Sequence, residues 1–413
     1  MENYILKSTW VSISLINFFI AALMGLLLRS AFVWEFNWLE YRNMLHAHSH
    51  LAMLGWVYLI LFSLLIDYFV PEEKKQKPFY NRLFWGTQFA VFGMMVSFPI
   101  QGYGLFSISF SCLHILASYL FVFRFWKDMT LSDPQVKLLI KSSLVFLLIS
   151  TLGLWALGLV MVSLGKISPL YQVTIQFFLH FQFNGWFTLG VFALVLNSLK
   201  KHGFELRSKI FNRVFRLLLA GILLTFAHVL DWAYPNRIFY IINGIGVIFQ
   251  LMAFVFLLGK GVRKYSLEKS NFLELPNLLL VFGLVSWAFK IIVQAFLIFP
   301  AVSEISTLIR NFMIGYIHLT MLGFVTGLIF WCLAIKKDRN YQPSGIYLFI
   351  IGFLGTELIL FVQGGFYWMG WGMLPFYHEA LVGFSLLLPL GIIKAWFIFS
   401  RKNPAMVANH IIS

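Results

Sequence analysis

Apolar runs long enough to cross a bilayer recur along the whole chain and restrict what it can fold into. A transmembrane helix needs about 20 consecutive apolar residues. We count about twelve such runs, and they show none of the period-two alternation of barrel strands. They cover residues 10–28, 44–70, 84–100, 105–123, 138–164, 171–199, 217–233, 238–258, 278–299, 312–335, 346–362 and 373–398. The sequence therefore predicts an all-α, polytopic membrane protein.

Composition excludes a water-soluble globular domain. Hydrophobic residues make up 60% of the 413 positions and charged residues only 11%, and the mean hydropathy is +0.83. No small-residue cleavage site follows the first run, so we expect it to stay in the protein as an anchor. Cys112 and Cys332 lie inside predicted helices without a CxxC motif, which predicts neither a disulfide framework nor covalent haem attachment.

The net charge of +15 is distributed as in a membrane protein. Lys and Arg concentrate in alternate connections, around residues 74–82, 124–141, 200–216, 260–269, 336–339 and 394–402. This is the positive-inside pattern, and it predicts that both termini are cytoplasmic. The basic excess would then face anionic lipid headgroups. We expect a bacterial inner-membrane protein that contacts the lipid bilayer and binds no nucleic acid.

Eight of the ten histidines fall at one predicted depth. At 1.5 Å per residue they lie within about 15 Å of the outer surface, although six different runs carry them. They are His46, His48, His50, His114, His180, His228, His318 and His378. Each one alone could be a hydrogen-bonded packing residue, but imidazoles that converge are the commonest metal ligands. We therefore predict a shared haem or metal site, and assign none to His202 or His410.

Three runs begin with similar residues. The second contains HSHLAMLGW from His48, the tenth YIHLTMLGF from Tyr316, and the sixth the looser HFQFNGW from His180. This similarity predicts pseudo-repeats over about 10–123, 138–258 and 278–398. Within the second run, His46 and His50 share one helix face, and His48 points about 200° away. One helix could therefore serve two sites.

A chain of twelve helices with histidines near the outer ends of its second, sixth, seventh and tenth helices resembles the catalytic subunit of the haem–copper oxidase superfamily, which includes nitric oxide reductases. That family is built as three four-helix arcs. The opening LHAHSH is also similar to the W-H-A-H-E start of the NnrS family, twelve-helix haem-associated membrane proteins linked to nitric oxide stress, but departs from it at the glutamate.

The oxidase resemblance implies a low-spin haem b held by His318 and by His46, His48 or His50. The repeat favours His50 as the axial ligand, whereas the spacing to Gly55 favours His46. The resemblance also implies a copper site at His180 and His228, which His48, His114 or His378 would complete. Its binuclear centre is incomplete here.

Three departures remove parts of that centre. Tyr316 stands where the high-spin haem ligand is expected, Ala227 replaces one of a histidine pair, and Asn184 occupies the position of the active-site tyrosine of many oxidases. The resemblance therefore implies electron transfer or a modified oxidoreductase activity, with a redox partner or oxidase-complex subunits.

Two charged residues, Lys290 and Glu357, fall about halfway across predicted helices, where a charge is costly. They predict a structural ion pair, a neutralised side chain or a proton path. Two functional alternatives stay open. One is a haem- or copper-handling assembly protein. The other is a secondary transporter, whose site would lie near the midplane at broken helices.

Overall fold

The computed structural model describes residues 8–260, 274–336 and 343–400, and these ranges contain helices and no strands. Twelve of their helices are long and apolar enough to cross a membrane, which confirms the predicted number. The spans are α1 (Ser8–Ser30), α2–η1–α3 (Tyr41–Phe69), α5 (Pro78–Gln101), α6 (Leu105–Asp128), α7 (Pro134–Ser163), α8–η2–α9 (Pro169–Lys201), α10–α11 (Ser208–Ala233), α12 (Arg237–Lys260), α13–η4 (Leu275–Ile298), α15–η5–α16 (Arg310–Ala334), α17 (Ser344–Trp368) and α18 (Tyr377–Ser400). Of the ten histidines, only His410 lies outside the described residues.

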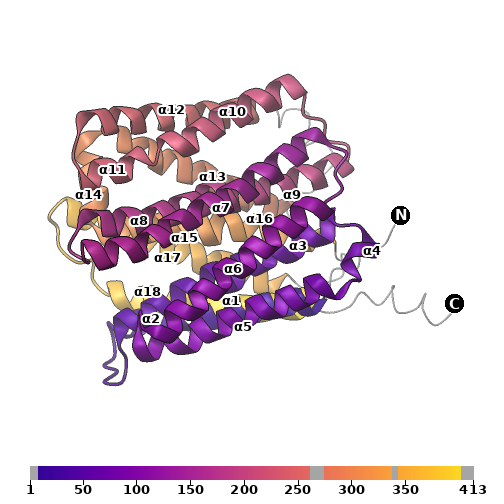
Figure 1. Ribbon diagram of the computed structural model, residues 1–413. Helices are drawn as coiled ribbons and strands as arrows, with labels where there is room; N and C mark the ends of the chain where they lie inside the picture. Colours follow the sequence, from indigo (N-terminus) through magenta and orange to yellow (C-terminus); the bar gives the residue numbers. More distant parts are fainter. Residues whose placement is uncertain (1–7, 261–273, 337–342, 401–413) are drawn as a thin grey trace. The chain divides into compact units, whose positions relative to one another are not determined.

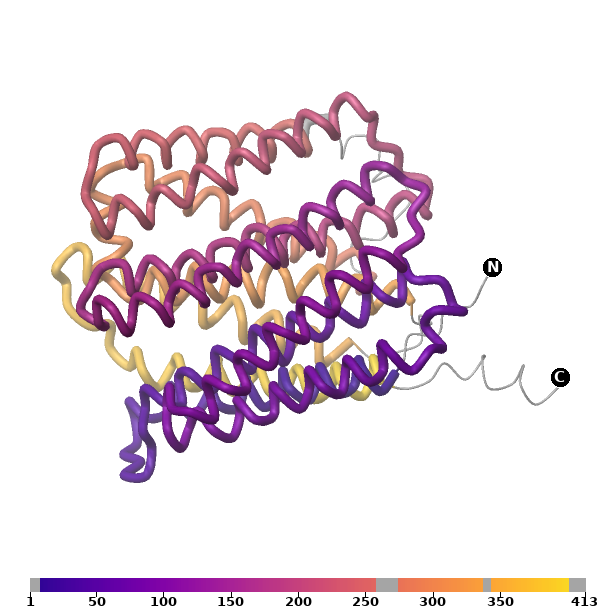
Figure 2. The backbone as a smooth tube through the Cα atoms, viewed as in Figure 1, coloured from indigo at the N-terminus to yellow at the C-terminus, as the bar shows by residue number. Residues whose placement is uncertain are grey.

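The chain divides into two compact units. The terminal unit comprises Met1–Thr130 and Ile329–Ser413, and the central unit Leu131–Leu328. Within the terminal unit, α5 packs beside α6, and α18 packs against both α1 and α17 (Figure 1). Within the central unit, α10 lies along α12, as the backbone in Figure 2 shows, and α7 packs against α8, η2 and α9. The tenth span contributes residues to both units.

Three spans are far more buried than the others. The most apolar windows of the second, sixth and tenth spans are 83%, 78% and 83% buried, against 28% to 50% for the other nine. These three spans carry the similar sequences found above. Elsewhere, large apolar side chains point outward, as with Leu159 (74% exposed) and Val162 (91%) on α7. Such surfaces would contact lipid in a membrane.

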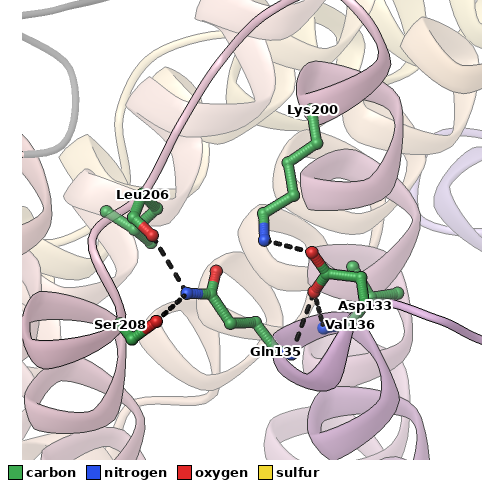
Figure 3. A network of polar contacts seen from close by, with 6 residues as sticks. All are labelled: Asp133, Gln135, Val136, Lys200, Leu206 and Ser208. Carbon is green, nitrogen blue, oxygen red and sulfur yellow. Dashed lines mark hydrogen bonds and ion pairs between the residues drawn. The ribbon is translucent and has the colours of Figure 1, made fainter.

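A polar network joins the ends of three helices in the central unit (Figure 3). Asp133 is the N-cap of α7, and its Oδ1 accepts hydrogen bonds from the backbone N–H groups of Gln135 and Val136 at 2.9 and 3.0 Å. Its Oδ2 accepts from Lys200 at the end of α9. The Gln135 side chain donates to the Leu206 carbonyl at 2.9 Å. The network therefore ties the start of α7 to the segment between α9 and α10.

Two buried aspartates form a second set of contacts in the terminal unit. Asp67, at the end of α3 (Leu59–Phe69), pairs with Lys75 and Lys336. Asp128, at the end of α6, pairs with Lys74 and Arg124. The short helix α4 (Glu72–Lys75) supplies one lysine to each aspartate. It therefore holds the ends of two spans together.

Candidate functional site

A π-helical segment directly follows a histidine in each of the three most buried spans. His50 precedes η1 (Leu51–Tyr58), His180 precedes η2 (Phe181–Phe187), and His318 precedes η5 (Leu319–Thr326). Segments with the wider i→i+5 turn are rare, and they occur frequently at functional sites. The structure thus gives these three histidines the same local backbone setting.

The sequence after each histidine explains how these segments pack. A glycine lies five residues on, at Gly55, Gly185 and Gly323, and a buried aromatic residue follows it. A Cβ on Gly55 would lie 2.7 Å from the Leu51 side chain and one on Gly185 2.4 Å from the Phe146 ring. A side chain at either position would therefore require Leu51, in the same segment as Gly55, or Phe146, on α7, to move.

The His50 ring is held in a defined orientation. Its Nδ1 lies 2.8 Å from the His46 carbonyl oxygen. Because a carbonyl only accepts, Nδ1 carries the proton and Nε2 has a free lone pair. The ring packs on Phe98 with the ring centres 4.3 Å apart, and Tyr103 lies at 6.0 Å. A backbone partner for the other nitrogen is the usual arrangement of a metal-ligating histidine.

His48 projects from α2 (Tyr41–His50) toward a different neighbour, as its position on the helix predicts. Its Nδ1 lies 2.8 Å from the Ala21 carbonyl of α1. A Cβ on Gly25 would come within 2.8 Å of the His48 ring, so glycine there makes room for the imidazole. The second span therefore presents histidines to two separate neighbours.

His114 on α6 is the most buried of the described histidines of the terminal unit. Only 4% of it is exposed, and its Nε2 has no hydrogen-bond partner among the described residues. Its ring contacts the edge of Tyr58 with the centres 4.6 Å apart. His114 also lies within electrostatic range of His50. His378, by contrast, stacks on Phe32 in the same unit.

In the central unit, His180 already uses one ring nitrogen. Its Nε2 lies 2.8 Å from the Ile222 carbonyl. That carbonyl is available because α10 (Ser208–Leu224) ends two residues later and the last four carbonyls of a helix have no intrahelical donor. His228 lies just beyond this break in the seventh span, at the start of α11 (Ala227–Ala233), and within electrostatic range of His180. Its Nδ1 lies 3.5 Å from the Ser303 hydroxyl.

Lys290 contacts the same region from α13 (Leu275–Ala295). Its ammonium donates to the Asn184 side-chain oxygen in η2 at 2.7 Å and lies 5.6 Å from the Tyr316 ring centre. The Asn184 amide nitrogen donates to the His180 carbonyl at 3.1 Å. Glu357 lies in the terminal unit, within electrostatic range of Arg29. The two buried charges predicted from the sequence therefore have different neighbours.

The described residues contain no group of three or more His, Cys, Asp or Glu side chains arranged to hold a metal ion. His180 and His228 come near one another, but the described part of the chain brings no third ligand of these types to them. The copper site stays a prediction. The predicted haem ligands, His318 on one side and His46, His48 or His50 on the other, belong to different units, so their pairing stays a prediction too.

The sequence prediction did not identify two polar groups that contact the histidine-bearing spans, one in each unit. Asn17 on α1 donates to the Gly55 carbonyl inside η1 at 2.9 Å and to the Gln88 side chain at 2.8 Å. An amide in the middle of an apolar span is the signal that could have identified it. The Ile222 carbonyl could not have been found, because a backbone acceptor has no side-chain signature.

Comparison of the chain with protein-family models and with curated proteins finds no match. The functional proposal therefore rests on the residues and distances described above.

Proposed function

We propose that the chain is a haem-binding integral membrane protein in which His318 and His50 ligate a low-spin haem b. The observation that carries the proposal is the shared setting of these two histidines, each placed directly before a π-helical segment in a highly buried span. A bis-histidine haem needs imidazoles from two helices. The second and tenth spans would supply them.

The donor chemistry at His50 fits this group. Its Nδ1–H is held by the His46 carbonyl, so Nε2 is the ligating nitrogen and needs no deprotonation. The same contact makes His46 a positioning residue through its backbone and favours His50 over His46 as the axial ligand. His48 has a similarly fixed tautomer but is directed to α1. Bound haem would supply one-electron redox chemistry.

The protein's own residues would orient and shield the group. Phe98 and Tyr103 pack against the His50 ring and limit its rotation. Asn17 fixes the η1 backbone that follows. The proposal includes an arrangement of the helices in three four-helix arcs, cytoplasmic termini and a location in a bacterial inner membrane. It also includes a redox partner or oxidase-complex subunits. A copper ion at His180 and His228 is its least supported part.

Spectroscopy of the purified protein tests the proposal directly. The wild type should show reducible Soret and α bands and a pyridine haemochrome of haem b. His318→Ala and His50→Ala should each lose the low-spin spectrum, because each removes one axial ligand. His48→Ala and His202→Ala serve as matched controls and should retain it, since the His48 ring is directed to α1 and the His202 ring contacts the Ser198 carbonyl at a helix end. A wild type without reducible haem would overturn the proposal.

The broken helices of the central unit favour a secondary transporter as the second candidate function. Transporter sites lie near the midplane beside interrupted helices, and here Lys290 meets η2 close to the break between α10 and α11. A haem-handling protein related to the nitric oxide response is the third. Metal and haem analysis of the purified chain separates the transporter from both haem proteins, and pull-down of an oxidase subunit would distinguish an assembly role.

A further inference from the structure

The ammonium of Lys290 is buried, and no carboxylate of the described residues pairs with it. Only 3% of the residue is exposed, and among the described residues no Asp or Glu lies within ion-pair distance of it. Its polar contact is a neutral amide, the side-chain oxygen of Asn184 at 2.7 Å. An unpaired charge in the interior of a membrane protein is costly, and such residues commonly mark ion or substrate sites.

A second hydrogen-bond donor, the side-chain amide of Gln294, lies on the same helix as Lys290. Gln294 lies four residues on along α13, so it shares the face of the helix that carries Lys290. Its Oε1 accepts from the Tyr316 hydroxyl at 3.3 Å, and its Nε2 makes no hydrogen bond with the described residues. Gln294 is only 6% exposed. The ammonium retains two further N–H groups after its bond to Asn184.

From this arrangement we propose that Lys290 and Gln294 form a binding site for a small monovalent anion in the central unit, beside η2. The ammonium supplies the charge and the Gln294 amide the second donor, while Asn184 and the Tyr316 ring hold the ammonium in place. The ammonium, which has no Asp or Glu partner among the described residues, can neutralise one negative charge of a ligand. The site should therefore prefer a halide or a short monocarboxylate to a divalent anion.

The surrounding packing limits the size of the ligand. Trp287, one turn earlier on α13, is 3% exposed and packs on Phe192, with ring centres 5.0 Å apart, and on Phe254, at 5.3 Å. The side of the site toward Trp287 is therefore closed by aromatic rings. The site does not depend on the haem proposal, because it uses neither His50 nor His318.

Bromide and chloride binding to the full-length protein in detergent tests the site. Chloride-35 NMR in a gluconate-balanced buffer should show line broadening that bromide displaces in a saturable manner. Saturating bromide should also raise the midpoint of thermal unfolding relative to gluconate at equal ionic strength. Lys290→Met should abolish both effects. Lys166→Met removes an exposed lysine of the same unit and should change neither.

Two results would overturn the site. One is a wild type without displaceable broadening, and the other is equal broadening in Lys290→Met. If Lys290→Met does not fold, Gln294→Leu keeps the cation and should weaken bromide binding several-fold, so an unchanged affinity in that variant also refutes the site. Haem content is measured on the same samples, so that failure of anion binding can be distinguished from failure of haem binding.

Discussion

Asp133 combines two stabilising roles at the start of α7, and substitutions can separate them. Asp133→Ala removes the acceptor for two backbone N–H groups and the partner of Lys200. Loss of an N-cap costs about 1 kcal/mol. The side chains of the ion pair are 22% and 31% exposed, so its loss should cost about 0.5–1 kcal/mol. We expect Asp133→Ala to lower the free energy of unfolding by about 2 kcal/mol when both losses are combined.

Asp133→Ser separates the two contributions because serine still caps the helix but carries no charge. It should cost about 1 kcal/mol or less, the part that belongs to the ion pair and the helix dipole. Reversible unfolding in mixed micelles, followed by circular dichroism, measures these differences. A double-mutant cycle with Lys200→Met isolates the pair and should give a coupling energy of about 0.5–1 kcal/mol.

The pH dependence follows from the same contacts. Burial raises the pKa of Asp133, but hydrogen bonds from Lys200 and from the N–H groups of Val136 and Gln135 outweigh it and leave the pKa below its ordinary value. The unfolded chain therefore binds the proton more readily. The stabilisation is complete above the ordinary pKa and is lost as the pH falls through the lowered one. Equal stabilities of Asp133→Ala and Asp133→Ser, or a zero coupling energy, would refute this account.

Three further perturbations test the packing that positions the site. Gly185→Ala should lower the free energy of unfolding by about 1–3 kcal/mol, because the new Cβ would lie 2.4 Å from the Phe146 ring. Gly158→Ala is the control: a Cβ there meets nothing within 4 Å, so this variant should not be destabilised in the same unfolding assay. Asn17→Leu should lower the free energy of unfolding by about 1–2 kcal/mol, as expected for the loss of an interhelical hydrogen bond in a membrane protein. If the variant were as stable as the wild type, the Gly55 carbonyl would need no donor from Asn17. Asp67→Asn should lower the free energy of unfolding by about 1–3 kcal/mol, because Lys75 and Lys336 lose the buried carboxylate that they share, while Lys75 keeps its contact with the Asp67 carbonyl. Glu72→Gln is its control, since Glu72 is 57% exposed and its pair with Lys75 is 3.6 Å long.

The number and approximate limits of the spans followed from the sequence alone. A run of about 20 apolar residues in lipid has to satisfy its own backbone hydrogen bonds, and a helix does so without help from distant residues. The similarity of the second, sixth and tenth runs was also visible, because the histidine, glycine and aromatic positions of each run lie close together in the chain.

Contacts between helices were decided only in three dimensions. The sequence placed His46 and His50 on one face, but could not choose between them. The proposal that His50 is the axial ligand rests on a hydrogen bond from its Nδ1 to the His46 carbonyl, which the structure shows within α2. Likewise, Lys290 and Glu357 looked like partners by depth, whereas Lys290 contacts Asn184 on a helix about a hundred residues earlier in the chain.

The sequence by itself determined that this chain forms twelve apolar helices, because hydropathy and backbone hydrogen bonding act over each run separately. Only the tertiary structure decided which nitrogen of each imidazole is occupied, where π-helical turns widen the three most buried spans, and which buried charge lacks a carboxylate. Apart from the His50 contact with His46 in its own helix, those properties depend on acceptors and packing surfaces from other helices. A carbonyl such as that of Ile222 becomes a partner only where its helix ends beside His180.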